Sequence, residues 1–127
     1  MIVKNQDRQP TQLDPKVQRK ILSHSGQLMA VEFQFDKGGV GTVHSHPHEQ
    51  IGYIVKGSFE LEIDGEKQIL QAGDTYYAAS NVPHGVVALE DGVIFDVFTP
   101  IREDFLMEGC TGLVYCAGTA LVEQCPQ

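Results

Sequence analysis

The sequence predicts an all-β domain, in the form of a sandwich, a jelly roll or a closed barrel. Many short segments show the period-two alternation of strands, and turns rich in Gly, Pro, Asn and Asp separate them at regular spacing. With 127 residues the chain is expected to form a single domain, because domains cluster around ~100–150 residues. No helical period of useful length competes with the strands, except a short turn near residues 102–107, and no internal repeat is present.

The expected strands follow one another from residue 19 onward. In residues 29–35 and 59–63, apolar side chains occupy every second position, which is the pattern of a half-buried strand. Asp64-Gly65 directly follows the second of these strands and predicts a hairpin, because both positions of such a turn favour positive φ. The other expected strands are residues 51–55, 67–70, 75–78, 85–89 and 93–98.

The two ends of the chain differ from its middle. We expect an N-terminal arm or edge strand in residues 1–18, a barrel in residues 19–108 and a C-terminal tail in residues 109–127. The three cysteines all lie in this tail, and their odd number and spacing predict ordinary free thiols. The tail is also apolar and needs cover from water, so we predict that it takes part in a homodimer contact.

Charge and composition exclude several classes of protein. Seventeen acidic residues against nine basic ones give a net charge of −8, which argues against a nucleic-acid-binding groove. No segment approaches the ~18 consecutive apolar residues that a membrane span needs. The N-terminus lacks the apolar region of a secretory signal. We therefore expect a soluble cytoplasmic protein that acts on a small molecule.

Three of the five histidines lie within residues 44–48. Positions i and i+2 of a strand share one face at ~6–7 Å, so His44 and His46 at a strand end can converge on one cation. If the chain turns after them, Gln50 starts the next strand and can face back toward the ion. His84 is the candidate for the remaining ligand, since it ends a second turn.

Two other interpretations of these histidines stay open. The cluster could be a group of solvated loop side chains, or His46 and His48 could form the strand pair. Pro47 lies between the latter two and would damage the strand, which disfavours that pairing. We expect His48 and His24 to lie at the surface or behind the ligands.

Residues 93–102 form the second informative segment. Asp96 lies in the middle of an apolar strand, where a carboxylate is costly to bury unless it is paired or functional. Arg102 is the only Lys or Arg in residues 68–127, and its guanidinium suits bidentate binding of a carboxylate. The alternatives are an Asp96 on a solvent-facing edge strand and an ion pair between Arg102 and a neighbouring acid, Glu103 or Asp104.

The motifs that hold the histidines resemble those of the cupin superfamily. Gly41-x2-His44-x-His46-x3-Gln50-x6-Gly57 resembles the first cupin motif, and the segment from Gly73 to His84 resembles the second. Gln50 stands where Glu is usual, Ala79 where Pro is usual and Ala88 where Asn is usual, and Gly is absent at position 81. The resemblance covers about residues 19–107 and implies a single-domain cupin jelly-roll β-barrel with a divalent metal inside, often as a dimer.

Residues 44–50 together with residues 95–106 resemble one subgroup, the pectin-degradation cupins that linearise unsaturated uronates. The resemblance implies that the metal is held by His44, His46, Gln50 and His84. It also implies functional roles for Asp96, Phe98 and Arg102.

A glutamine in place of glutamate changes the expected chemistry of the metal. Three neutral imidazoles and one amide leave the full charge on the ion, so it binds less tightly but acts as a stronger Lewis acid. Imidazole-rich sites accept Ni, Zn, Fe or Mn with little discrimination, so the sequence leaves the identity of the metal open.

The resulting hypothesis is a metal-dependent isomerase acting on 4-deoxy-4,5-unsaturated uronates from pectin or alginate breakdown. Asp96 is the expected proton relay, Arg102 the expected binder of the substrate carboxylate, and Phe98 the expected wall of the pocket. A cupin dioxygenase and a non-catalytic, metal-containing sugar- or ligand-binding module are the alternatives.

Overall fold

The computed structural model describes residues 1–106. Within this range the regular secondary structure is almost entirely β-strand, with one 3-10 turn near the start and one short helix after the last strand. In chain order the elements are η1 (Asn5–Asp7), β1 (Thr11–Asp14), β2 (Val17–Ser25), β3 (Leu28–Phe35), β4 (Val40–His44), β5 (Glu49–Lys56), β6 (Ser58–Ile63), β7 (Glu66–Gln71), β8 (Thr75–Ala78), β9 (His84–Ala88), β10 (Gly92–Thr99) and α1 (Glu103–Leu106).

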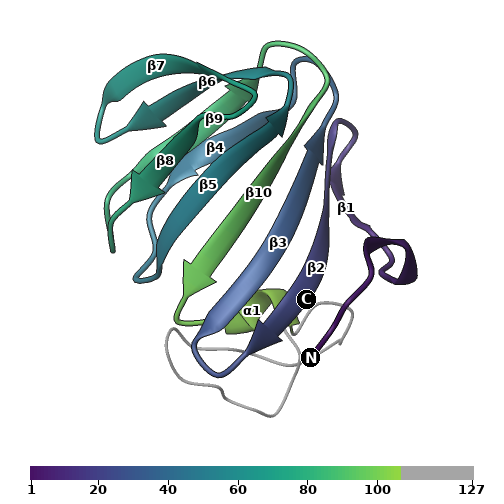
Figure 1. Cartoon of the computed structure of the whole chain (residues 1–127). Coiled ribbons are helices and arrows are strands. Elements are labelled where there is room, and N and C mark those ends of the chain that lie inside the picture. Colours follow the sequence, from purple (N-terminus) through teal and green to yellow (C-terminus); the bar gives the residue numbers. More distant parts are fainter. Residues whose placement is uncertain (107–127) are drawn as a thin grey trace.

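The strands form two antiparallel sheets (Figure 1). One sheet has six strands in the order β1-β2-β3-β10-β5-β8, and the other has four in the order β4-β9-β6-β7. The last strand of the described chain, β10, therefore lies in the middle of the larger sheet, between β3 and β5. The expectation of an all-β, single-domain jelly roll is confirmed.

The alternation seen in the sequence determines which side chains face the interior. In β3, Met29, Val31 and Phe35 are buried, while the residues between them are partly exposed. The β6–β7 hairpin turns at Asp64-Gly65, where both residues have positive φ, at 53° and 83°. Gly tolerates this conformation without the steric cost that a Cβ would bring. The predicted hairpin is therefore confirmed.

Most of the predicted strands agree with the observed ones to within a residue or two. The range 75–78 matches β8 at both ends, and the ranges 85–89 and 93–98 differ from β9 and β10 by one residue at each end. The turn expected near residues 102–107 is the helix α1. At the N-terminal side, β1 pairs with β2 and forms one edge of the larger sheet.

Two apolar clusters form the core of the described residues. The larger contains residues from both sheets: Val17, Phe35, Ile54, Phe59, Leu61, Ala88 and Ile94. The smaller lies beside α1 and consists of Met29, Val31, Phe98 and Phe105. Ile94 and Phe98 of β10 belong to different clusters, so Asp96 lies between the two apolar regions on the same inward face.

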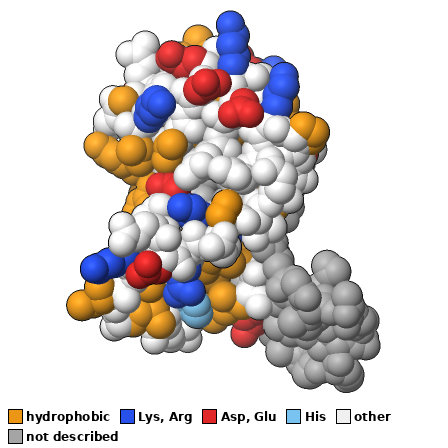
Figure 2. Space-filling model, turned by 90° about the vertical axis from the view of Figure 1, so that its right-hand side faces the viewer, with side chains coloured by type: hydrophobic (Ala, Val, Ile, Leu, Met, Phe, Trp, Pro, Cys, Tyr) orange, Lys and Arg blue, Asp and Glu red, His pale blue; other side chains and the backbone are white. Residues whose placement is uncertain are grey.

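Some sequence-based expectations concern residues outside the described range. The tail 109–127, its three cysteines and its homodimer contact lie there, and these predictions stay untested. Among residues 1–106, no helix has the length and apolar character needed to cross a membrane. On the face shown in Figure 2, basic and acidic side chains of the described residues are interspersed and not separated by sign.

Candidate metal centre

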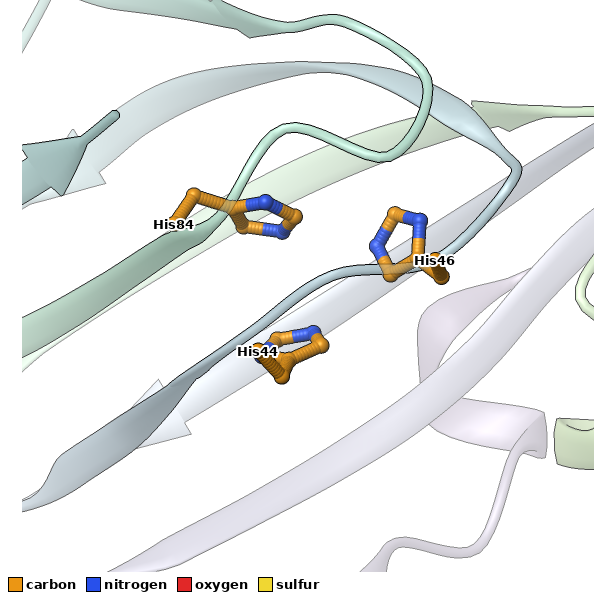
Figure 3. A group of neighbouring side chains, drawn as sticks. All are labelled: His44, His46 and His84. Carbon is orange, nitrogen blue, oxygen red and sulfur yellow. The ribbon is translucent and has the colours of Figure 1, made fainter.

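Three histidines from two strands and a loop meet at one point (Figure 3). His44 is the last residue of β4 and pairs in register with His84, the first residue of β9. Ring centroids are 4.7 Å apart for His44 and His84, 4.9 Å for His46 and His84, and 5.2 Å for His44 and His46. One ring nitrogen from each lies within 4.8 Å of the other two, so the three could hold a metal ion together.

The position of His46 corrects one detail of the sequence prediction. We expected His44 and His46 to lie on one strand, but β4 ends at His44 and His46 belongs to the loop before β5. The path of this loop, and not the alternation of side chains along a strand, brings the His46 imidazole close to those of His44 and His84. His48 and His24 do not belong to the group of three, although the His48 ring lies 5.4 Å from that of His46.

The backbone determines which nitrogen of each ring is available. Nδ1 of His44, His46 and His84 each lies 2.8–2.9 Å from a carbonyl oxygen two residues away in the chain. A carbonyl only accepts hydrogen bonds, so Nδ1 carries the proton and the lone pair is on Nε2. In His46 and His84 this Nε2 is buried and has no partner within the described chain. A buried acceptor without a partner is costly, and a metal ion would satisfy it.

The environment of the rings also keeps them in the neutral form that a metal requires. Burial lowers the pKa of His46 to about 4, and the positive charge of Arg102 contributes to the shift. Burial lowers the pKa of His84 as well. Since a metal ion binds the neutral imidazole, these lowered pKa values favour the metal-binding form of both rings at neutral pH.

Gln50 supplies a further buried donor atom beside the histidines. It lies on the inward face of β5 and is only 4% exposed. Its Nε2 donates a 2.9 Å hydrogen bond to the hydroxyl of Tyr76, while its Oε1 is buried without a partner within the described chain. Imidazole nitrogens and an amide oxygen are ligands that divalent Zn, Ni, Fe and Mn accept. The donor set therefore fits such an ion.

Asp96 is buried on the central strand β10, so the alternative of an exposed edge position is excluded. Its Oδ1 accepts a 2.7 Å hydrogen bond from the hydroxyl of Tyr76. Burial raises its pKa to about 7, although the hydrogen bond from Tyr76 and the charge of Arg102 act in the opposite direction. A carboxyl group with this pKa can both hold and release a proton at neutral pH.

Arg102 directly precedes α1 and lines the same cavity as His44 and His84. Its Nε and Nη2 donate to the carboxylate of Asp104 at 3.1 and 2.8 Å, so the ion pair considered as an alternative is present. Its guanidinium carbon lies 4.1 Å from the ring centre of Phe105 and 5.4 Å from that of Phe98. Burial opposes ionisation of Asp104, but Arg102 outweighs it and lowers the pKa of that carboxyl.

These groups surround a cavity of about 390 Å³. Its walls include most of the residues that the sequence singles out, together with apolar side chains of both sheets. The predicted site residues among them are His44, Gln50, His84, Asp96, Phe98 and Arg102. The volume is suited to one small molecule.

Three residues that shape this site were not identified from the sequence. Tyr76 connects Gln50 with Asp96, and Gly52 lies between Tyr76 and Asp96 in the sheet. Arg19 lines the cavity with its guanidinium 3.7 Å from the ring centre of Phe105, and it is 8% exposed. A glycine inside an apolar strand is a known sign of close approach, so Gly52 is the one that the sequence could have indicated.

Comparison with known proteins places the chain in a family. The cupin domain matches residues 31–98. The pectin degradation protein KdgF of Dickeya dadantii (strain 3937) is 50% identical over 97 residues, which is 75% of this chain and 88% of that protein.

Solved structures agree with this assignment. KdgF from Halomonas sp. superposes with a TM-score of 0.80 and 45% identity, covering 83% of this chain and 97% of that one. An RmlC-like cupin from Shewanella frigidimarina NCIMB 400 has a TM-score of 0.79 and 36% identity, covering 82% and 94%. With its two-sheet jelly roll and clustered histidines, the chain belongs to the cupin family and is a relative of the KdgF pectin degradation proteins.

Proposed function

We propose that the protein is a metal-dependent isomerase that converts 4-deoxy-4,5-unsaturated uronates into linear 5-keto sugar acids. The proposal depends on one observation above all. A buried carboxyl with a pKa of about 7, Asp96, shares a cavity with the histidine cluster and with Arg102. The relationship to KdgF, a pectin degradation protein, supports the choice of an unsaturated uronate as substrate.

The reaction needs two proton movements and no oxidant. The C1 hydroxyl loses its proton, the bond between C1 and the ring oxygen breaks, and the ring oxygen takes up a proton, which leaves an aldehyde at C1 and an enol at C5. A proton then adds to C4 while the enol loses its own proton, and the product is a 5-ketone. Product and substrate have the same composition, so proton transfer and charge stabilisation are the tasks of the site.

The described residues can be assigned to these tasks. His44, His46, His84 and Gln50 would hold a divalent ion, which supplies Lewis acidity toward substrate oxygens when bound. Arg102 binds the substrate carboxylate, with its orientation held by Asp104. Asp96 takes a proton from one position of the substrate and returns one to another. Phe98, next to the C-terminal residue of β10, lines the cavity and packs against the sugar ring.

A turnover assay in heavy water tests the proposal. Chelator-treated protein is loaded separately with Ni²⁺, Zn²⁺, Mn²⁺ or Fe²⁺ and mixed with unsaturated galacturonate. We expect the ultraviolet absorbance of the conjugated enol acid to disappear and one deuterium to appear at C4 of the product by NMR. Oxygen consumption would instead indicate a dioxygenase, and saturable binding without product would indicate a binding module.

We also propose that the protein is a cytoplasmic homodimer. Apolar side chains are exposed on the outer face of β5 and its neighbour β8, and burying them against a second copy would remove them from water. They are Ile51, Tyr53, Val55 and Tyr77. Size-exclusion chromatography with light scattering distinguishes a dimer from a monomer directly.

A further inference from the structure

We infer that Tyr76 is a positioning residue whose hydroxyl determines which end of the Gln50 amide faces the metal. The inference rests on the metal site of the proposed function, but not on the reaction. Tyr76 lies on β8, an edge strand of the larger sheet, and its hydroxyl is hydrogen-bonded to Gln50 and Asp96. Its effect on the ion would therefore be exerted through Gln50.

The direction of two hydrogen bonds determines the orientation of the amide. The Tyr76 hydroxyl has one proton, and it donates this proton to Oδ1 of Asp96, at 2.7 Å from Oη to Oδ1. The lone pairs of Oη then accept the amide NH2 of Gln50, at 2.9 Å. If the amide were rotated by half a turn, Oε1 would face Oη of Tyr76. Both atoms would then be acceptors, because the hydroxyl proton is already donated to Asp96. The hydroxyl therefore keeps Nε2 on its own side and leaves Oε1 for the ion.

The burial of this group makes the orientation matter. Gln50 and Asp96 are each 4% exposed, so water cannot readily replace a lost hydrogen bond. The Oε1 atom of Gln50 is buried and has no hydrogen-bond partner among residues 1–106.

Gly52 is what allows Tyr76 to reach these two residues. In the register of the sheet, Gly52 of β5 pairs with Tyr76 on one side and with Asp96 on the other. A Cβ at this position would lie 2.5 Å from Asp96 Oδ1 and would overlap the Tyr76 ring. Because Gly52 has no side chain, the Tyr76 ring can lie over β5 at this position and its hydroxyl can reach the carboxylate of Asp96.

The same tyrosine also holds Asp96. Its hydroxyl donates to Oδ1 of this carboxyl. One phenol thus holds both a metal ligand and the candidate proton carrier, and their relative position is fixed by a single rigid ring.

Cobalt binding to four variants tests the inference. Chelator-treated wild type, Tyr76→Phe, Gln50→Glu and the double variant are titrated with Co²⁺ and followed by visible absorption. We expect Tyr76→Phe to lower the Co²⁺ affinity ~10–100-fold, the range for residues that support metal ligands, and to change the ligand-field spectrum. In Gln50→Glu either carboxylate oxygen can face the ion, so Tyr76→Phe should there cost roughly twofold or less.

Tyr77→Phe is the matched control. Tyr77 is the next residue of β8, and its hydroxyl donates a 2.7 Å bond to Glu49 on the outside of the sheet. It should bind Co²⁺ like the wild type. Equal affinities of Tyr76→Phe and Tyr77→Phe would overturn the inference. So would equal losses from Tyr76→Phe in the wild-type chain and in the chain that carries Gln50→Glu.

NMR of the unmodified protein gives a second test that does not depend on a variant folding. The side-chain amide protons of Gln50 should show nuclear Overhauser effects to the Tyr76 ring with and without Zn²⁺. Amide protons that instead contact the histidine rings would contradict the assigned orientation. A protein that orients Gln50 as expected but does not turn over uronates would retain this inference and lose the proposed function. A protein that binds no metal would lose both.

Discussion

The hydroxyl of Tyr76 donates a 2.7 Å hydrogen bond to Oδ1 of Asp96 across the glycine that separates them in the sheet. A buried carboxyl is thereby held in one orientation while its pKa is raised to about 7. Fixed geometry and a pKa near neutrality are the two properties that a proton carrier needs, since both its forms are populated at working pH. Asp96 is therefore the residue at which a substitution should affect turnover most.

Replacing Asp96 with asparagine should reduce turnover of the unsaturated uronate by about 10²–10⁴-fold, the usual contribution of a general acid–base group. An asparagine oxygen can still accept the hydrogen bond from Tyr76, so folding and metal content should be retained. The measurement is the loss of ultraviolet absorbance per bound metal ion. Turnover close to that of the wild type would remove Asp96 from the mechanism.

Replacing His84 with alanine should weaken metal binding by at least the ~10–100-fold that is typical of residues which merely support ligands. The reason is that His84 contributes one of the three clustered ring nitrogens. Metal content after dialysis, measured by atomic emission, checks this. His24→Ala is the control, because His24 lies on β2 and outside the cluster, and equal metal loss in both variants would contradict the assignment.

Replacing Arg102 with lysine should raise the KM for the uronate about tenfold or more, with a smaller change in kcat. Lysine keeps the positive charge but loses bidentate geometry, and a hydrogen bond to a charged group contributes ~1.5–3 kcal/mol. Arg8→Lys, outside the cavity lining, is the control. A KM unaffected by Arg102→Lys would show that the substrate carboxylate binds elsewhere.

The ion pair of Arg102 and Asp104 predicts a pH-dependent contribution to stability. Arg102 holds the pKa of Asp104 below its ordinary value of 3.8 in the folded chain. The folded state therefore binds fewer protons than the unfolded state, so the contribution is present above pH 3.8 and disappears as the pH falls through the folded pKa.

Asp104→Asn should lower the free energy of unfolding by up to ~1 kcal/mol at neutral pH, because the Asp104 side chain is 43% exposed and its ion pair is screened by solvent. Urea unfolding of both proteins from about pH 7 to about pH 3 should show the difference shrinking toward zero in acid. A difference that grows in acid would contradict the sign of the pKa shift.

Local patterns were sufficient to predict most of this fold. The alternation in residues 29–35 and the Asp64-Gly65 turn depend on neighbouring residues alone, and both are confirmed. Alternation placed Asp96 on one face with Ile94 and Phe98, but the opposite face is equally apolar, so the sequence left open whether Asp96 points inward. The three histidines could be grouped because their motifs lie at the ends of turns.

Other parts of the site depend on contacts between distant strands, which one sequence does not reveal. Tyr76 looks like any aromatic residue of an edge strand until the register places it opposite Gly52. His46 was expected on a strand because alternation cannot foresee where β4 ends. By contrast, the ion pair of Arg102 is local, and the sequence had named Glu103 or Asp104 as its partner; the structure shows the pair with Asp104.

The register that makes His44 and His84 direct partners has a consequence for the periphery of the smaller sheet. β4 is one of its two edge strands and is bonded on one side only, to β9. An ion shared by the two imidazoles would act as a cross-link between this unprotected strand and its neighbour. Backbone amides of β4 should then exchange with deuterated solvent more slowly when the metal is bound. Hydrogen exchange of this edge strand would therefore report whether the metal site is occupied.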